Sequence, residues 1–230
     1  QISSRLWDSW VKFRLSDSWS AKLGVFMLPF TRESLVSDKY QLAVDRSLID
    51  YRVGLARSQG VEFTWSSGNK RVFLATTNGS NTLTSINASN NNPTPPWPAL
   101  DSDSEWSVTA RTEFLLEGSW EQFNQFTSPV GSENATMFGI ALHAQNQERN
   151  NLGGAKRDQV GITADLSMHF DGATLFASGT FHNQKNVTPT APNVDWLGYV
   201  VQGSTYMTDT TEAFLRFEGG GAMLDDLGGD

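Results

Sequence analysis

The residues best suited to act on a solute lie in one long segment, Pro29 to Ser58. Acidic and basic side chains alternate along it, and seven of them would form a constriction if the segment crossed a narrow aqueous passage: Arg32, Glu33, Asp38, Lys39, Asp45, Arg46 and Arg52. Opposed charges at a narrow point orient water and polar solutes and set selectivity. The alternative is that Arg32, Asp45 and Arg46 form salt bridges that anchor the segment to a wall. Either role requires elements that enclose the segment.

Covalent catalysis and metal binding are not indicated by the remaining residues. The chain has no cysteine, and its three histidines, His143, His169 and His182, are too scattered to form a ligand cluster. The acidic runs lack the spacing of a calcium-binding loop, and no Ser/His/Asp constellation is evident from spacing. We therefore expect no enzymatic activity, no cofactor and no metal ion. A net charge of -8 also argues against a nucleic-acid partner.

The stretch QVGITADLSMHF, residues 159–170, indicates which elements the chain forms. Apolar side chains occupy every second position, and polar ones fill most of the positions between them. This period of two predicts a β-strand. Asp171 and Gly172 then supply a two-residue turn, and a second alternating strand begins directly after it. The same pattern recurs along the chain and predicts roughly ten strands.

The connections between these strands alternate in length. Short joins are expected at 16–20, 66–69, 171–172 and 208–210, and long ones at 29–58, 77–104, 145–157 and 183–194. Only the connection from Glu117 to Ala135 breaks the alternation, because it should be short and is long. A transmembrane β-barrel has short turns at one end and long loops at the other. A soluble sandwich with Greek-key crossings has no reason to segregate its long loops in this way.

Strand length and the placement of aromatic residues agree with a barrel. Strands near ten residues match the hydrocarbon thickness and exceed the five or six residues usual in soluble sheets. Aromatic residues gather at strand ends, where an interfacial girdle would place them: Trp7, Trp65, Trp106, Phe170, Trp196 and Tyr206. We predict that residues 1–230 are a single all-β domain, an antiparallel up-and-down transmembrane β-barrel in an outer membrane, with Ile162, Leu166 and Leu175 touching lipid.

The polar face of such strands would line a water-filled lumen. The predicted pore-lining residues are Lys12, Arg14, Glu62, Arg111, Glu113, Asp165, His169, Gln202, Glu212 and Arg216. For Arg111 with Glu113, and for Arg216 with Glu212, cross-strand pairing within the wall is the simpler interpretation. His169 and His182 are expected to be lumenal polar residues, not ligands. The acidic balance predicts a weakly selective channel for small hydrophilic solutes or ions that leans toward cations.

Two other classes of function stay open at this stage. A soluble carbohydrate-binding β-sandwich would cluster its tryptophans on one concave face, and it would purify without detergent. An outer-membrane enzyme would need an acid, a base or a nucleophile set on one barrel wall, which sequence spacing alone does not reveal.

Several motifs resemble the phosphate-selective porin O and P family. In that family a Gly-x-hydrophobic strand ends in Pro-Phe and is followed by an Arg-Glu pair and an acidic-Arg-Ser-Leu segment. The stretches GVEFTW and GYVVQGSTYMTDTTEAFLRFE are similar to later strands of the same family. The resemblance implies an outer-membrane diffusion channel of a Gram-negative envelope, usually a homotrimer, with a long loop folded into the lumen. The residues that match the first motif are Gly24, Pro29, Phe30, Arg32, Glu33, Arg46, Ser47 and Leu48.

The chain also departs from that family. Porins of this type have about sixteen strands, and roughly ten are expected here, so the complete barrel is expected to contain more chain, because free strand edges in lipid leave backbone groups unpaired. The family's phosphate selectivity depends on a ladder of lumenal arginine and lysine residues. The balance here is acidic, and phosphate transport is therefore not carried over.

Overall fold

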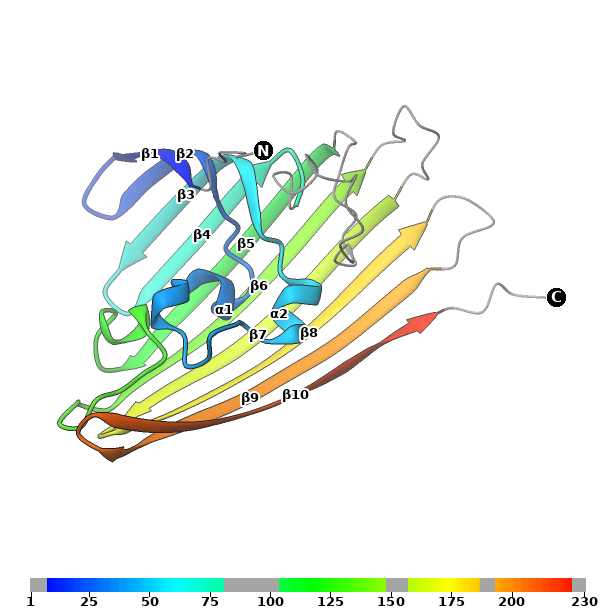
Figure 1. The fold of residues 1–230 in the computed structure, drawn as a ribbon. Helices are drawn as coiled ribbons and strands as arrows, with labels where there is room; N and C mark the ends of the chain where they lie inside the picture. The colour runs from blue at the N-terminus through cyan, green and yellow to red at the C-terminus, as the bar shows by residue number, and fades with distance from the viewer. Residues whose placement is uncertain (1–7, 81–103, 148–156, 187–192, 225–230) are drawn as a thin grey trace, which may run out of the picture.

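The computed structural model describes residues 8–80, 104–147, 157–186 and 193–224. Within them the chain forms one antiparallel sheet in which every strand pairs with its neighbours in sequence, and this confirms the expected all-β, up-and-down arrangement (Figure 1). The strands are β1 (Ser9–Arg14), β2 (Trp19–Met27), β3 (Arg57–Ser67), β4 (Lys70–Thr77), β5 (Ser104–Glu117), β6 (Ala135–Gln147), β7 (Arg157–Phe170), β8 (Ala173–Asn186), β9 (Val194–Thr208) and β10 (Thr211–Leu224).

In the described residues, helical structure is confined to the connections. Two short α-helices, α1 (Arg32–Leu35) and α2 (Leu48–Val53), and a 3-10 turn, η1 (Asp38–Tyr40), lie between β2 and β3. A further 3-10 turn, η3 (Gln122–Asn124), lies between β5 and β6. No helix in the described part of the chain is long and apolar enough to cross a membrane.

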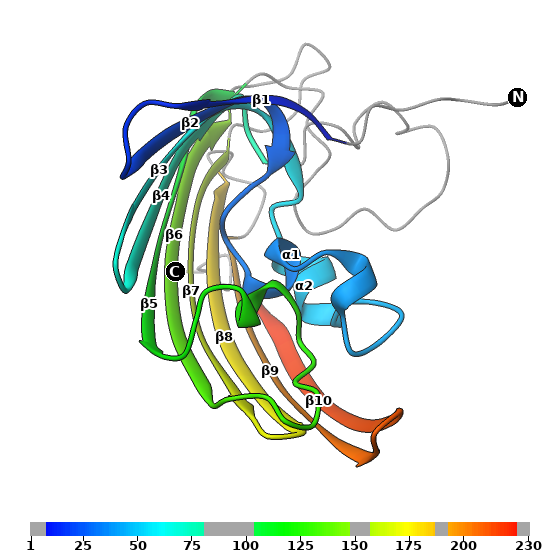
Figure 2. The same ribbon diagram turned by 90° about the vertical axis from the view of Figure 1, so that its left-hand side faces the viewer.

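The sheet is strongly curved but not closed, with β1 and β10 as its edges (Figure 2). Its short turns lie at one end and most long connections start from the other (Figure 1). The exception is again the β5–β6 connection, residues 118–134. It starts from the short-turn end and folds over the concave face, where Phe123 and Phe126 are buried. This connection is therefore long because it packs against the concave face of the sheet.

The apolar side chains of β7, and Leu175 of β8, point away from the centre of the molecule. Ile162 is 39% exposed, Leu175 is 42% exposed, and Leu166 is also exposed, all on the convex face. Their sequence neighbours Thr163, Asp165 and Ser167 lie buried on the concave face. A soluble sheet buries its apolar face and exposes its polar one. The opposite arrangement here is the one that lipid requires, and it disfavours the β-sandwich.

The β2–β3 connection, residues 28–56, fills much of the concave side. Figure 2 shows α1 and α2 inside the curve of the sheet. Three small apolar clusters hold the inner layer together: Phe26, Leu28, Phe30, Leu55, Ala75 and Ala141; Val36, Phe126, Phe176 and Val200 with Leu42 and Ile49; and Phe123, Ala135 and Met137 with Leu115 and Trp120. The core of the molecule therefore lies where the two inward-folded connections, β2–β3 and β5–β6, pack against the concave wall.

The expected aromatic girdle forms only in part. Trp65 pairs with Trp19 at an end of the sheet, and Trp106 and Phe170 are exposed on the convex face. Trp196 shares the inward face of β9 with Gly198, which packs against Ile49 of the connection, so it does not face lipid. Tyr206 lies on the same inward face of β9. Trp7 lies outside the described residues.

Candidate functional site

Arg111 on β5 holds the root of the β2–β3 connection against the wall. Its side chain is fully buried and donates in three directions. Nη1 and Nη2 bind the two carboxylate oxygens of Asp165 at 2.8 and 3.0 Å, Nε binds Glu113 at 2.9 Å, and Nη1 also donates to the carbonyl of Phe30 at 2.9 Å. A guanidinium is the group that can satisfy all three acceptors at once, because it carries five donors in a fixed plane. We call Arg111, Glu113 and Asp165 the arginine clamp.

The clamp depends on a glycine between its two partners. Gly139 on β6 lies opposite Glu113 on one side and Asp165 on the other. A Cβ at this position would lie 2.2 Å from Nη2 of Arg111 and 2.7 Å from Oδ1 of Asp165. The guanidinium thus crosses over β6 to reach β7 only because residue 139 has no side chain.

Replacing Gly139 by alanine should displace the clamp. We expect a loss of about 1–3 kcal/mol in the free energy of unfolding, the usual cost of forcing extra atoms into a packed site. Gly179→Ala is the matched control, because a Cβ at position 179 would meet nothing within 4 Å. Urea unfolding of the two variants in lipid vesicles measures the difference. Equal stabilities would show that Arg111 does not need this space.

Arg32 joins the connection to the second inward-folded segment. Its guanidinium donates to the carbonyl of Phe123 and lies over the ring of Phe126, 5.8 Å from the centroid. Burial, chiefly, lowers the pKa of Arg32 to about 10. His169 on β7 lies on the other side, its ring 5.0 Å from that of Phe123. Arg32 therefore serves packing between the two connections.

The two helices of the connection are joined by hydroxyl and carboxyl groups. Glu33 on α1 accepts from Ser47, from the backbone N–H at 3.0 Å and from Oγ at 2.6 Å. Ser47 caps α2 by accepting from the N–H of Asp50. The Asp50 carboxylate accepts from Thr31 and, at 2.9 Å, from Ser34. We call Glu33, Ser47 and Asp50, with the hydroxyls of Thr31 and Ser34, the carboxyl latch.

Arg46 closes the connection around the latch. Its Nε donates to the carbonyl of Glu33 at 2.9 Å and Nη2 to that of Val36 at 3.0 Å. It also forms an ion pair with Asp38 at 2.5 Å and lies 3.8 Å from Asp50. The expected salt bridges of Arg46 thus form within the connection instead of to the wall.

The far side of the connection is attached to β10. Arg216 donates to the carbonyl of Asp45 at 3.1 Å, and Glu218 accepts from the N–H of Leu48 at 2.8 Å. Arg216 also donates to Gln202 at 3.0 Å, while Glu212 accepts from Ser204 instead of pairing with Arg216. The connection therefore spans the concavity from β5 to β10.

The predicted constriction residues divide into two groups. Arg32 and Glu33 are buried, and Arg46 is partly buried among its partners. Asp38, Lys39, Asp45 and Arg52 are exposed. The exposed group consists of two acidic and two basic side chains.

The predicted pore-lining residues also fall into two groups by burial. All ten lie on the concave side of their strands, as expected from the alternation, but six of them are covered: Glu62, Arg111, Glu113, Asp165, His169 and Gln202. Lys12 and Arg14 are exposed, Arg14 pairing with Asp17, and Glu212 and Arg216 are half-buried. The covered residues support the inner layer from behind and do not contact solvent directly.

Sequence reasoning missed two parts of this wall. Lys22 on β2 pairs with Glu62 on β3 at 2.7 Å, at positions that are directly opposite in the register. On β5 to β7 a buried network of hydrogen bonds links Thr109 to His143, His143 to Gln145 and Gln145 to Gln159. Alternation placed these residues on the polar face. Only the register shows that they meet.

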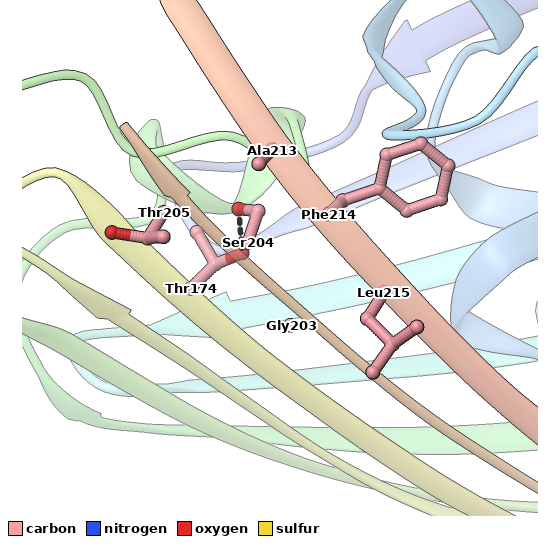
Figure 3. A pocket seen from close by; sticks show the side chains of 7 residues that line it. All are labelled: Thr174, Gly203, Ser204, Thr205, Ala213, Phe214 and Leu215. Carbon is pink, nitrogen blue, oxygen red and sulfur yellow. Dashed lines mark hydrogen bonds between the residues drawn. The ribbon is translucent and has the colours of Figure 1, made fainter. Parts of the chain in front are cut away.

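A shallow pocket near the short-turn end is lined by small, hydroxyl-bearing and apolar residues. It lies between β8, β9 and β10, where Thr174 and Ser204 share a hydrogen bond of 2.7 Å (Figure 3). No ionisable side chain lines it. The described residues also contain no group of three or more histidine or acidic side chains that could hold a metal ion.

Fold and site together define the class of protein. An up-and-down sheet with apolar side chains outward and polar ones inward, and with a charged connection folded into its concavity, is the wall of an outer-membrane β-barrel channel. The sequence model for phosphate-selective porins O and P matches residues 2–216, and the chain belongs to that family. It is therefore an outer-membrane porin of bacteria, a channel and not an enzyme at the level that the family defines. No curated protein and no solved structure gives a significant match.

Proposed function

We propose that this porin passes small hydrophilic solutes or ions by passive diffusion, with the β2–β3 connection as its constriction. The observation that carries the proposal is the position of that connection inside the curve of an inside-out sheet, fixed by Arg111 on one side and Arg216 on the other. Asp38, Lys39, Asp45 and Arg52 are the side chains that a solute would meet there. Lys12, Arg14, Glu212 and Arg216 line the approach.

The pairing of basic side chains argues against a phosphate ladder. Arg111, Lys22 and Arg46 each have a carboxylate partner within 3.0 Å. Arg32 is buried against Phe126. Cations neutralised or covered in this way offer little to a passing anion, because their donors are either already hydrogen-bonded or buried away from the aqueous passage. With the net charge of -8, this favours weak preference for cations over anions.

Reversal potentials across a planar bilayer in a potassium chloride gradient test the proposal. We expect stepwise currents whose reversal potential has the sign of a modest cation preference. Asp45→Asn should reduce that preference, because it removes an exposed acidic group, and Asp209→Asn, in the exposed β9–β10 turn, is the control. A strongly anion-selective current would contradict the solute class, and an absence of current would contradict the channel.

We also propose that residues 1–230 belong to one closed barrel domain that assembles as a homotrimer. Closure is supported by the open edges of β1 and β10, which cannot stay unpaired in hydrocarbon. The trimer is supported only by the family. The native mass in mild detergent checks the assembly, and a monomer would exclude it.

A further inference from the structure

We propose that the carboxyl latch makes the constriction sensitive to pH, so that the helical half of the β2–β3 connection is held firmly at acidic pH and loosens as the pH rises toward neutrality. This inference deepens the proposed channel function and rests on it only where current is the readout. The Arg111 contact at Phe30 would remain at either pH, because a guanidinium stays charged. The connection would therefore loosen from one side only.

The geometry places two carboxyl groups where both cannot be ionised without cost. Glu33 is 3% exposed and Asp50 is 8% exposed, and both lie between the same two short helices. Their nearest donors are hydroxyls and backbone N–H groups from Thr31, Ser34 and Ser47. Burial opposes the charged form of each group, and a second nearby carboxylate opposes it further.

The surrounding charges do not cancel this effect. Within the connection, Arg46 is nearest to Asp50 but shares its charge with Asp38. From β10, Arg216 and Glu218 approach with opposite signs. Arg32 lies next to Glu33 in sequence, but its charge interacts with Glu113, Arg111, Asp165 and Arg71 of the wall.

The pKa shifts agree with the geometry. Burial, followed by the nearby Asp50 carboxylate, raises the pKa of Glu33 to about 7 from its ordinary value of 4.5. Burial also raises the pKa of Asp50, against the hydroxyl bonds from Thr31 and Ser34. We call the helical half of the connection docked when the latch is closed, as in the structure, and released when it is open. The docked connection thus binds a proton more tightly than the released one. Docking is fully favourable below pH 4.5 and weakens by up to about tenfold per pH unit until the pH passes the raised pKa.

The chain has no cysteine, so one label can be placed anywhere without background. Val44 is 97% exposed within the connection and suits a nitroxide label through Val44→Cys. Asn69→Cys, in the exposed β3–β4 turn, is the reference position. In the full chain folded into phosphatidylcholine vesicles, the spectrum at position 44 should become more mobile from pH 4 to pH 8, and the change should be complete once the pH has passed about 7. The spectrum at position 69 should not change.

Glu33→Gln is the decisive variant, because the amide keeps the shape and cannot ionise. It should reduce the pH-dependent step and keep the label closer to its low-pH mobility, and the double variant Glu33→Gln/Asp50→Asn, which leaves no ionisable carboxyl in the latch, should abolish the step. Asp50→Asn should lower the midpoint by removing the neighbouring charge, and it serves as the second variant if Glu33→Gln does not fold. A flat wild-type profile, or an unchanged step in a folded Glu33→Gln protein, would overturn the proposal.

Current recordings separate this proposal from the channel function. Wild-type open-channel noise or conductance should rise over the same pH range, and the rise should be smaller in Glu33→Gln and absent in the double variant Glu33→Gln/Asp50→Asn. If the label follows pH but no current flows at any pH, the latch stands and the channel proposal fails. If current flows and neither readout depends on pH, the channel stands and the latch fails.

Discussion

Arg111→Ala should destabilise the protein by about 3–5 kcal/mol and release the constriction. Removing one member of a buried ion pair leaves the others charged and without compensation, and this usually costs more than the pair contributed. Here Asp165 and Glu113 would both lose their cation, and the Phe30 carbonyl would lose its donor. Unfolding in urea measures the stability, and the open-channel current measures the freed connection, which should give a larger and noisier conductance.

Arg14→Ala is the matched control for this result. Arg14 also forms an ion pair, with Asp17 at 2.7 Å, but both side chains are largely exposed. Exposed pairs contribute about 0–1 kcal/mol, so the free energy of unfolding of this variant should be close to that of the wild type. If both arginine variants had the same small effect, the clamp would not be what holds the connection.

Val201→Arg should make the free energy of folding into lipid bilayers less favourable by about 2–4 kcal/mol, the range for a lipid-facing arginine near the bilayer midplane. Val201 lies midway along β9 on the convex face and is exposed. In a soluble sandwich the same side chain would belong to the core and its replacement would also destabilise the protein in water. The measurement must therefore be made in lipid, where it reports the contact with hydrocarbon. Equilibrium folding into vesicles of defined composition gives the difference directly.

Two adjacent residues on β10 provide the control for orientation. Phe214 is 45% exposed and pairs with Ser204 on the concave side, whereas Leu215 is 78% exposed and pairs with Gly203 on the convex side. Figure 3 shows both around the pocket. Leu215→Arg should reduce folding into lipid more than Phe214→Arg, since only the first charge would face hydrocarbon. The reverse order would contradict the inside-out sheet.

Most of the sheet follows from local patterns. The turn at Asp171 and Gly172, and the alternation on both sides of it, locate β7 and β8 without further information. Alternating loop lengths then indicate an up-and-down transmembrane barrel. In such a barrel the apolar face of each strand is turned outward, toward lipid. The alternation is less informative in β9, where Trp196 and Tyr206 share a face with Gln202, and Leu197 and Tyr199 occupy the other. Apolar residues on both faces left the orientation of the aromatics undetermined.

The candidate site was identified only as a set of charges. Arg111 and Glu113 are two residues apart, so their proximity was foreseeable, but Asp165 is 54 positions away in sequence. The contact requires the register of β5, β6 and β7 and the absence of a side chain at Gly139. Likewise, Glu33 and Ser47 meet because the connection folds back on itself across 14 positions. No spacing rule predicts such a turn.

The sequence by itself determined the strands, their order and the outward direction of the apolar face, because side-chain alternation and turn chemistry act over a few residues. Tertiary structure alone decided which charges are covered and which meet solvent. That choice depends on how a long connection packs against a curved wall, where burial, register and the reach of one guanidinium act together over segments far apart in the chain.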